Sequence, residues 1–151
     1  MMNLDAQMKL LIQDAPEAGG TKQMVTAIAP AFYKLAQRLQ FLQYYVAQTL
    51  NGDWIRLSLS HRTQSKVEKT VIYAFFSAEM ITSGEVEGLS DVGKVEVLGV
   101  IDLLFRVWAL NLCDSVIFFN DQSNSSQGLE IARAEIDRVI RETLEPPGNF
   151  A

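Results

Sequence analysis

Apolar side chains recur every three or four residues along the first forty positions, which is the period of amphipathic helices. The pattern predicts two helices, the first with apolar positions at Leu4, Met8, Leu11 and Ile12 and the second at Val25, Ile28, Phe32, Leu35 and Leu39. Asn3 and Thr21 are candidate caps, because a short polar side chain can accept hydrogen bonds from the first free N–H groups of a helix. Pro30 lies inside the second stripe and predicts either a kink or a new helix beginning there.

From Phe41 to Ser60 the period changes to two, the alternation of β-strands, and Asn51-Gly52 divides this stretch into two halves. Because Asn and Gly both tolerate a positive φ, the dipeptide predicts a two-residue type I′ turn within a long hairpin. Leu50 would lie opposite Asp53, and the pairing would extend to Leu42 opposite His61. In this register one face is apolar, with Leu42, Val46, Leu57 and Leu59, and the other face is mixed, with Tyr45, Trp54 and Arg56.

Four further elements are predicted after the hairpin. Residues 67–77, rich in β-branched and aromatic side chains, predict a third strand, and residues 116–119 predict a fourth. Apolar positions spaced by three and four predict a long buried helix over 91–112 and a final amphipathic helix over 126–144. The third strand is apolar on both faces, so the side chains that join Leu57 in the core are either Val71, Tyr73 and Phe75 or Ile72, Ala74 and Phe76.

The order helix, helix, three strands, helix, strand, helix predicts an α+β fold in which helices pack on an antiparallel sheet of four to five strands. No internal repeat or low-complexity linker interrupts the 151 residues, so we expect a single domain, 1–151. Within it we expect an N-terminal helical segment over 3–39, the sheet and its helices over 41–145, and a tail over 146–151.

Charge and composition narrow the classes of function. The chain has 13 basic and 18 acidic residues, and its net charge of −5 disfavours nucleic acid as a partner, because a basic surface supplies most of that affinity. The longest apolar stretch, Leu98 to Leu112, is too short and too interrupted to span a membrane. The N-terminus lacks the pattern of a signal peptide, and a single cysteine cannot form an intrachain disulfide. We therefore expect a soluble, cytoplasmic protein.

The sequence offers few candidates for chemistry. His61 is the only histidine, and no motif places a Ser, Cys or Asp beside it, so we interpret it as a strand-end residue rather than a general base. Cys113 ends an apolar helix without a Cys-x-x-Cys partner, which favours a small buried side chain over a nucleophile. No glycine spacing matches a phosphate loop, and the acids from Glu85 to Glu96 lack the spacing of a metal site. We expect no catalytic residue, cofactor or metal.

Two features favour a protein partner. Residues 54–77 carry a net charge of +3 and residues 78–124 a net charge of −6, a polarised distribution that suits protein partners but that solubility alone would also explain. Tyr45, Trp54 and Arg56, on the mixed face of the hairpin, are residue types that dominate binding hot spots. The N-terminal helices could instead cover that face, in which case Trp54 would have a structural role.

At the level of topology, the chain resembles the type III secretion chaperone-like fold shared by the YbjN-like proteins. The resemblance covers Phe32 to Leu144 and depends on the element order, the Asn51-Gly52 hairpin, and the strand over 116–119 followed by the last helix. It implies a small acidic homodimer that binds other proteins. The family has two strands after its central helix, where this sequence predicts one.

These patterns lead to two hypotheses of function. The first is a non-catalytic, cytoplasmic protein-interaction or chaperone-like adaptor, which binds a partner protein or a second copy of itself. The second is a small-molecule-binding protein or enzyme with a pocket between the long helix and the sheet. Such a pocket would use Tyr44, Tyr73, Trp108 or Arg106.

Overall fold

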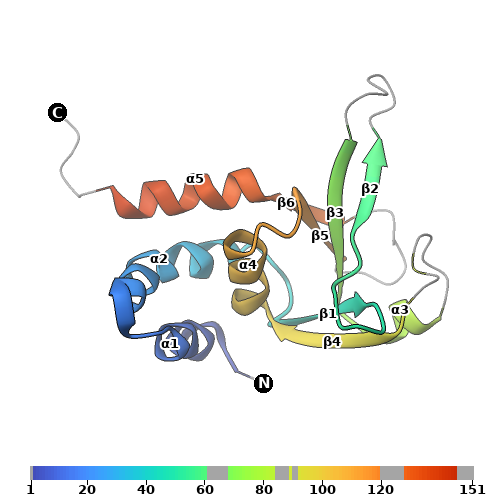
Figure 1. Cartoon of the computed structure of the whole chain (residues 1–151), viewed down its shortest axis with the longest axis horizontal. Helices are drawn as coiled ribbons and strands as arrows, with labels where there is room; N and C mark the ends of the chain where they lie inside the picture. Colours follow the sequence, from blue (N-terminus) through green and yellow to red (C-terminus); the bar gives the residue numbers. More distant parts are fainter. Residues whose placement is uncertain (1, 61–67, 84–88, 90–91, 120–127, 146–151) are drawn as a thin grey trace.

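The computed structural model describes residues 2–60, 68–83, 89, 92–119 and 128–145. The fold is α+β, with five α-helices and a six-stranded sheet in which most strand pairs are antiparallel. Four helices gather on one side of the sheet, and the short α3 lies on the other side (Figure 1). The helices are α1 (Leu4–Asp14), α2 (Thr21–Ala36), α3 (Glu79–Thr82), α4 (Val100–Ala109) and α5 (Arg133–Leu144), with a 3₁₀ turn, η1 (Ala18–Gly20), before α2.

The two N-terminal helices confirm the predicted stripes. Asn3 caps α1, its side-chain oxygen accepting a hydrogen bond from the N–H of Ala6 at 2.9 Å. The second helix is one element that contains Pro30, which excludes the second of the two predicted alternatives, a new helix beginning there. Thr21 is its first residue rather than its cap. The capping position belongs to Gly20, whose φ of 76° is the left-handed conformation that glycine adopts at little cost.

The sheet is organised around β3, which has neighbours on both edges. Its strands are β1 (Gln43–Gln48), β2 (Leu57–Ser60), β3 (Glu68–Phe75), β4 (Lys94–Gly99), β5 (Ser115–Phe119) and β6 (Gly128–Ala132). The order is β4-β1-β3-β5-β6, with β2 pairing with β3 as well. On one edge of β3, Tyr45 of β1 lies opposite Phe75 and Leu57 of β2 lies opposite Val71. On the other edge β5 runs parallel to β3, with Ser115 opposite Val71.

The hairpin turn differs from the prediction by one residue. Thr49 and Gly52 close the turn with a 3.0 Å backbone hydrogen bond, and the N–H of Thr49 donates to the carbonyl of Asp53 at 2.8 Å. Gly52 has a φ of 88°, whereas Asn51 is not among the residues with positive φ. The loop therefore has three residues, a type I turn followed by a bulge at Gly52. The type I′ prediction is wrong.

The one-residue shift changes which side chains share a face. Gln48 pairs with Trp54 instead of Ile55, and after Ile55 the second arm leaves β1 and joins β3. Val46 now packs on the helix side of the sheet and Leu57 on the opposite side, so the predicted apolar face is not formed. The long pairing toward Leu42 is also wrong, because β3 occupies that edge of β1.

Two strands lie where the sequence pattern predicted helix. Residues 94–99 form β4, which pairs with the free edge of β1, and the helix begins only at Val100. Residues 128–132 form β6 beside β5, and the last helix begins at Arg133 rather than at 126. In both places apolar residues also alternate, Val95 with Val97 and Leu129 with Ile131, so a short strand fits as well as a helix, and an open sheet edge decides the outcome.

Each face of the sheet carries its own apolar core. On the helix side the core contains Tyr44, Ile72 and Phe118, with the Tyr44 and Phe118 rings in edge contact at 4.9 Å. Phe32 of α2 meets the rings of Phe105 and Trp108 of α4 on the same side. On the opposite side Phe75 stacks on Phe119 at 5.1 Å, under α3. Tyr73 and Phe75 join Leu57 in this second core, which settles the question left open by the third strand.

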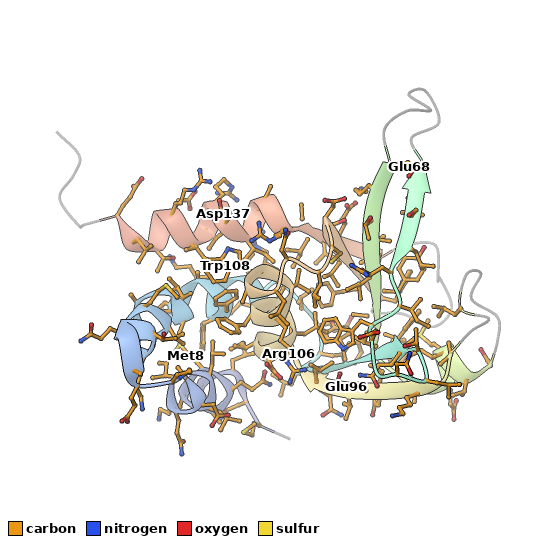
Figure 2. All side chains as sticks on the ribbon, in the orientation of Figure 1. Met8, Glu68, Glu96, Arg106, Trp108 and Asp137 are labelled. Carbon is orange, nitrogen blue, oxygen red and sulfur yellow. The ribbon has the colours of Figure 1, made fainter. Side chains whose placement is uncertain are left out.

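Helix α5 is attached to α4 by polar contacts as well as by packing. The indole Nε1 of Trp108 donates to the Asp137 carboxylate at 3.4 Å (Figure 2). Arg133 donates to the backbone carbonyl of Trp108 from both Nε and Nη2, at 3.2 and 2.9 Å. The Trp108 indole and the Arg141 guanidinium hold the pKa of the Asp137 carboxyl below its ordinary value. None of the described helices has the length and apolar run needed to cross a membrane.

The turn geometry predicts unequal costs for its two central residues. Gly52→Ala should lower the free energy of unfolding by about 1–2 kcal/mol, because a Cβ disfavours left-handed backbone. Asn51→Ala should cost less than about 0.5 kcal/mol, because its φ is not positive. Urea unfolding of both variants measures the difference. Equal losses would instead indicate a type I′ turn.

Candidate functional site

A cavity of about 420 Å³ lies between α1, the start of α2 and the first turns of α4. Its apolar wall comes from Leu10, Leu11, Val25 and Phe105. Its polar wall comes from Gln7, Asp14, Asp102 and Arg106. The α1 and α2 stripes meet α4 here, so the cavity follows directly from how the two N-terminal helices pack.

Gln7 is a buried polar residue that lines this cavity. Its side chain is buried and uses each polar atom: Nε2 donates to the carbonyls of Met2 and Leu42 at 3.0 and 2.9 Å, and Oε1 accepts from the N–H of Ile101 at 3.1 Å. The Ile101 N–H is one of the free donors at the start of α4, so Gln7 caps that helix from 94 residues away. The sequence does contain a sign of this contact, since Gln7 interrupts the apolar stripe of α1.

Gly99 makes room for the Gln7 amide. A Cβ at residue 99 would lie 2.7 Å from Gln7 Oε1, closer than such atoms approach in proteins. Gly99 also occupies the capping position of α4 and has no side chain that could cap the helix itself. The glycine and the distant glutamine therefore form one unit.

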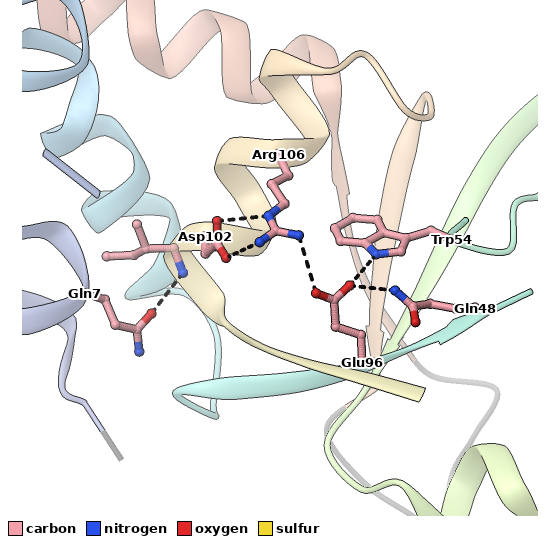
Figure 3. A network of polar contacts seen from close by, with 7 residues as sticks. Gln7, Gln48, Trp54, Glu96, Asp102 and Arg106 are labelled. Carbon is pink, nitrogen blue, oxygen red and sulfur yellow. Dashed lines mark hydrogen bonds and ion pairs between the residues drawn. The ribbon is translucent and has the colours of Figure 1, made fainter. Parts of the chain in front are cut away.

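Arg106 lies between two carboxylates beside the cavity (Figure 3). It contacts Asp102, one helical turn earlier, in a bidentate manner, with Nε to Oδ1 at 3.2 Å and Nη2 to Oδ2 at 3.1 Å. Its Nη1 lies 3.4 Å from Oε2 of Glu96. The other oxygen of Glu96 accepts hydrogen bonds from Trp54 Nε1 and Gln48 Nε2, both at 2.8 Å.

This network connects α4 to β4 and to the hairpin. Arg106 is committed to two acids, and Glu96 accepts from three side chains. The site can hold an apolar molecule and present carboxylates to its polar end. No cluster of three His, Cys, Asp or Glu side chains that could hold a metal ion occurs in the described part of the chain.

The structure does not bring the three predicted partner-binding residues to one surface. Trp54 packs against the helix-side core and is held by Glu96 of β4, rather than by the N-terminal helices. Tyr45 belongs to the opposite face of the sheet, and Arg56 is exposed. The register shift at Gly52 causes this separation. Their role in binding stays a prediction.

The residues predicted for a pocket between helix and sheet are also dispersed. Tyr44 is fully buried in the helix-side core, where loss of solvent raises the pKa of its hydroxyl to about 12. Tyr73 packs against Phe119 on the other face, and Trp108 contacts Phe32. Of the four, only Arg106 lines the cavity.

The remaining candidates have a simple outcome. Cys113 is buried, as predicted, and burial together with the Asp114 carboxylate raises the pKa of its thiol to about 11. The thiolate needed for a nucleophile is therefore scarce near neutral pH. His61, Glu85, Glu87 and Asp91 lie outside the described residues. Glu96, expected on a helix, lies on β4.

The pair formed by Gln7 and Gly99 predicts a measurable coupling. Gln7→Ala should lower the free energy of unfolding by about 1–3 kcal/mol, because it leaves the Ile101 N–H and the Leu42 carbonyl without their partner. Gly99→Ala should destabilise the wild type but cost about 0.5–3 kcal/mol less when Gln7 is already alanine. Urea unfolding of the four proteins of this double-mutant cycle tests the contact, and additive losses would contradict it.

The raised pKa of Cys113 predicts a loss of stability at alkaline pH. The thiol titrates near 9.0 when exposed and near 11 in the folded chain, so its contribution is complete below pH 9 and is lost as pH rises toward 11. The free energy of unfolding should fall by at most about 1.4 kcal/mol per pH unit in this window. In Cys113→Ala the slope between pH 9 and 10, where Tyr44 contributes little, should be shallower. An unchanged slope would show that Cys113 is not responsible.

Comparison of the chain with protein-family models, with curated proteins and with solved structures finds no match. The likeness to the type III secretion chaperone-like fold thus stays a prediction from element order. The site must be interpreted from its own geometry.

Proposed function

We propose that this protein is a non-catalytic, chaperone-like adaptor that binds an extended segment of another protein along the outer edge of β4. One observation carries the proposal. In the described part of the chain, β4 ends the sheet, and its opposite edge pairs with β1 over all six of its residues. An open strand edge presents backbone donors and acceptors that an added strand can pair with.

The register identifies the groups that would receive the partner. Val100 N–H donates to the carbonyl of Leu42, and partners in an antiparallel ladder alternate between bonded and non-bonded pairs. Counting back from Val100 by two residues at a time, the backbone N–H and C=O groups of Leu98 and Glu96 point toward β1. The N–H and C=O groups of Val95 and Val97 are therefore turned outward, where a partner strand would bond to them.

Side chains along β4 support the same surface. Val97 is half exposed, and Tyr45 lies opposite it on β1, half-buried on the face away from the helices. An added strand would place a side chain beside this pair and cover both. Of the three predicted partner-binding residues, Tyr45 lies on the strand beside β4, and Trp54 donates a hydrogen bond to Glu96 of β4.

A self-paired edge is the second part of the proposal. Two copies of β4 can pair as antiparallel strands about a two-fold axis, with Val97 of one copy opposite Val97 of the other. The helix-covered faces of the two sheets then lie on the same side, and two exposed valines come into contact. We propose that the free protein is a homodimer through β4 and that the partner segment replaces the second copy. The buried, protonated Cys113 supports a non-catalytic role, and a lone free cysteine supports a cytoplasmic location.

A proline at position 97 tests the edge selectively. Val97→Pro removes an outward N–H without touching the bonds to β1, and edge strands tolerate proline at such positions. Immobilised wild type and Val97→Thr, which keeps the N–H, should retain the same proteins from native extract, and Val97→Pro should retain at least about tenfold less of them. Proteins captured equally by all three would contradict the proposed edge.

Light scattering on purified protein tests the homodimer. At micromolar concentration the wild type should have twice the 16.9 kDa mass of one chain, and Val97→Pro should have that mass once. Circular dichroism and urea unfolding of Val97→Pro must show a folded protein. A wild type that is monomeric throughout would remove self-pairing from the proposal, while the capture experiment would still test the partner.

A further inference from the structure

We propose that the cavity between α1, α2 and α4 binds a small cationic amphiphile, an organic ammonium ion with an apolar tail. This site is separate from the outer edge of β4, so it does not rest on the adaptor function. Its volume of about 420 Å³ lies within the range of about 300–1,000 Å³ that is typical of small-molecule sites.

The apolar part of the cavity wall is the reason for proposing a ligand with an apolar tail. Leu11, Val25 and Phe105 line it, and Val25 is almost fully buried. Leu10 and Met2 also line the cavity, yet 38% and 46% of their surfaces remain exposed. A tail packed against these two side chains would remove their apolar surface from water, at about 25 cal/mol per Å².

Charge at the cavity accounts for the ammonium group. Asp14 and Asp102 line it from α1 and α4, and Arg106 is the one basic residue among the lining side chains. Arg106 already contacts Asp102 in a bidentate manner and Glu96 through its remaining nitrogen. Two carboxylates therefore line the cavity against one guanidinium, which also contacts Glu96 outside the lining, so the local charge is negative.

The same contacts disfavour an anionic ligand. The Gln7 amide nitrogen donates to two backbone carbonyls, so its donors are occupied. A carboxylate or phosphate would have to take Arg106 from Asp102 and would then lie beside both aspartates. A cation would share Asp102 with Arg106 and pair with Asp14 without removing an existing contact. Because both carboxylates are accessible to solvent, its attraction should weaken with added salt.

Three probes with the same eight-carbon tail separate the contributions of charge and tail. Octylammonium, octanoate and octanol are titrated below their aggregation concentrations into protein with labelled methyl groups, and binding is followed by methyl NMR. Octylammonium should shift the methyl signals of Met2, Leu10, Leu11 and Val25, with an affinity at least about tenfold above that of octanoate.

Variants assign the binding to the cavity. The double change Asp14→Asn and Asp102→Asn should weaken octylammonium binding by at least about tenfold. Asp5→Asn, which removes an exposed carboxylate of α1 outside the cavity, should leave it unchanged. Ala15→Phe, which places a ring into the cavity from its rim, should abolish the methyl shifts while urea unfolding shows an intact fold. Val97→Pro should bind octylammonium normally, so this proposal and the adaptor can fail independently.

Three outcomes would overturn the proposal. Equal affinity for octylammonium, octanol and octanoate would mean that the cavity selects an apolar tail alone. Binding that survives Ala15→Phe would place the ligand elsewhere. Absence of methyl shifts with all three probes would show that the cavity is closed to such molecules in solution.

Discussion

The capping of α4 from outside is the constraint on which the rest of the structure depends. This helix is the apolar centre of the helical layer, yet Gly99 gives it no cap of its own. Its first turn is completed by Gln7 of α1, and the carbonyl of Trp108 near its end is bonded by Arg133 of α5. Buried helix ends require partners, so α1 and α5 are fixed where those partners must lie. The position of α1 also explains the cavity. Gln7 fixes α1 against the start of α4, and the residues that follow it in α1 line the cavity together with the start of α2.

The sheet depends in a similar way on sharing one strand. β1 and β2 divide one edge of β3 between them, and β5 occupies the other edge. β1 pairs with β3 along one of its own edges and with β4 along the other. In the described part of the chain β4 is therefore the end of the sheet. The open edge comes from how the strands pair and the cavity from how α1, α2 and α4 pack, so the two proposals depend on different constraints.

Local patterns in the sequence identified α1, α2, β3 and β5, because caps, apolar stripes and β-branched runs are properties of neighbouring residues. They failed where a distant element decided the outcome. Residues 94–99 carry a pattern that helix and strand both fit, and the free edge of β1 selects strand. Asn51-Gly52 marked the turn correctly, but the number of loop residues was set by pairing, which moved Trp54 and Tyr45 to opposite faces. Of the cavity, only Arg106 was anticipated. The polar Gln7 within an apolar stripe was the available signal.

The parallel pairing of β3 and β5 has a consequence for how this chain reaches its native state. Thr70 and Asp114, which bond to each other at the start of the ladder, are 44 residues apart in sequence. Between them the chain must build β4 against β1 and turn back through α4 before β5 can enter the centre of the sheet. Closing such a loop costs entropy before any contact repays it, so the last and slowest step of folding should be the insertion of β5. Contacts between elements close in sequence should form before this step. They include the pairing of β5 with β6 and the packing of α1 against α2.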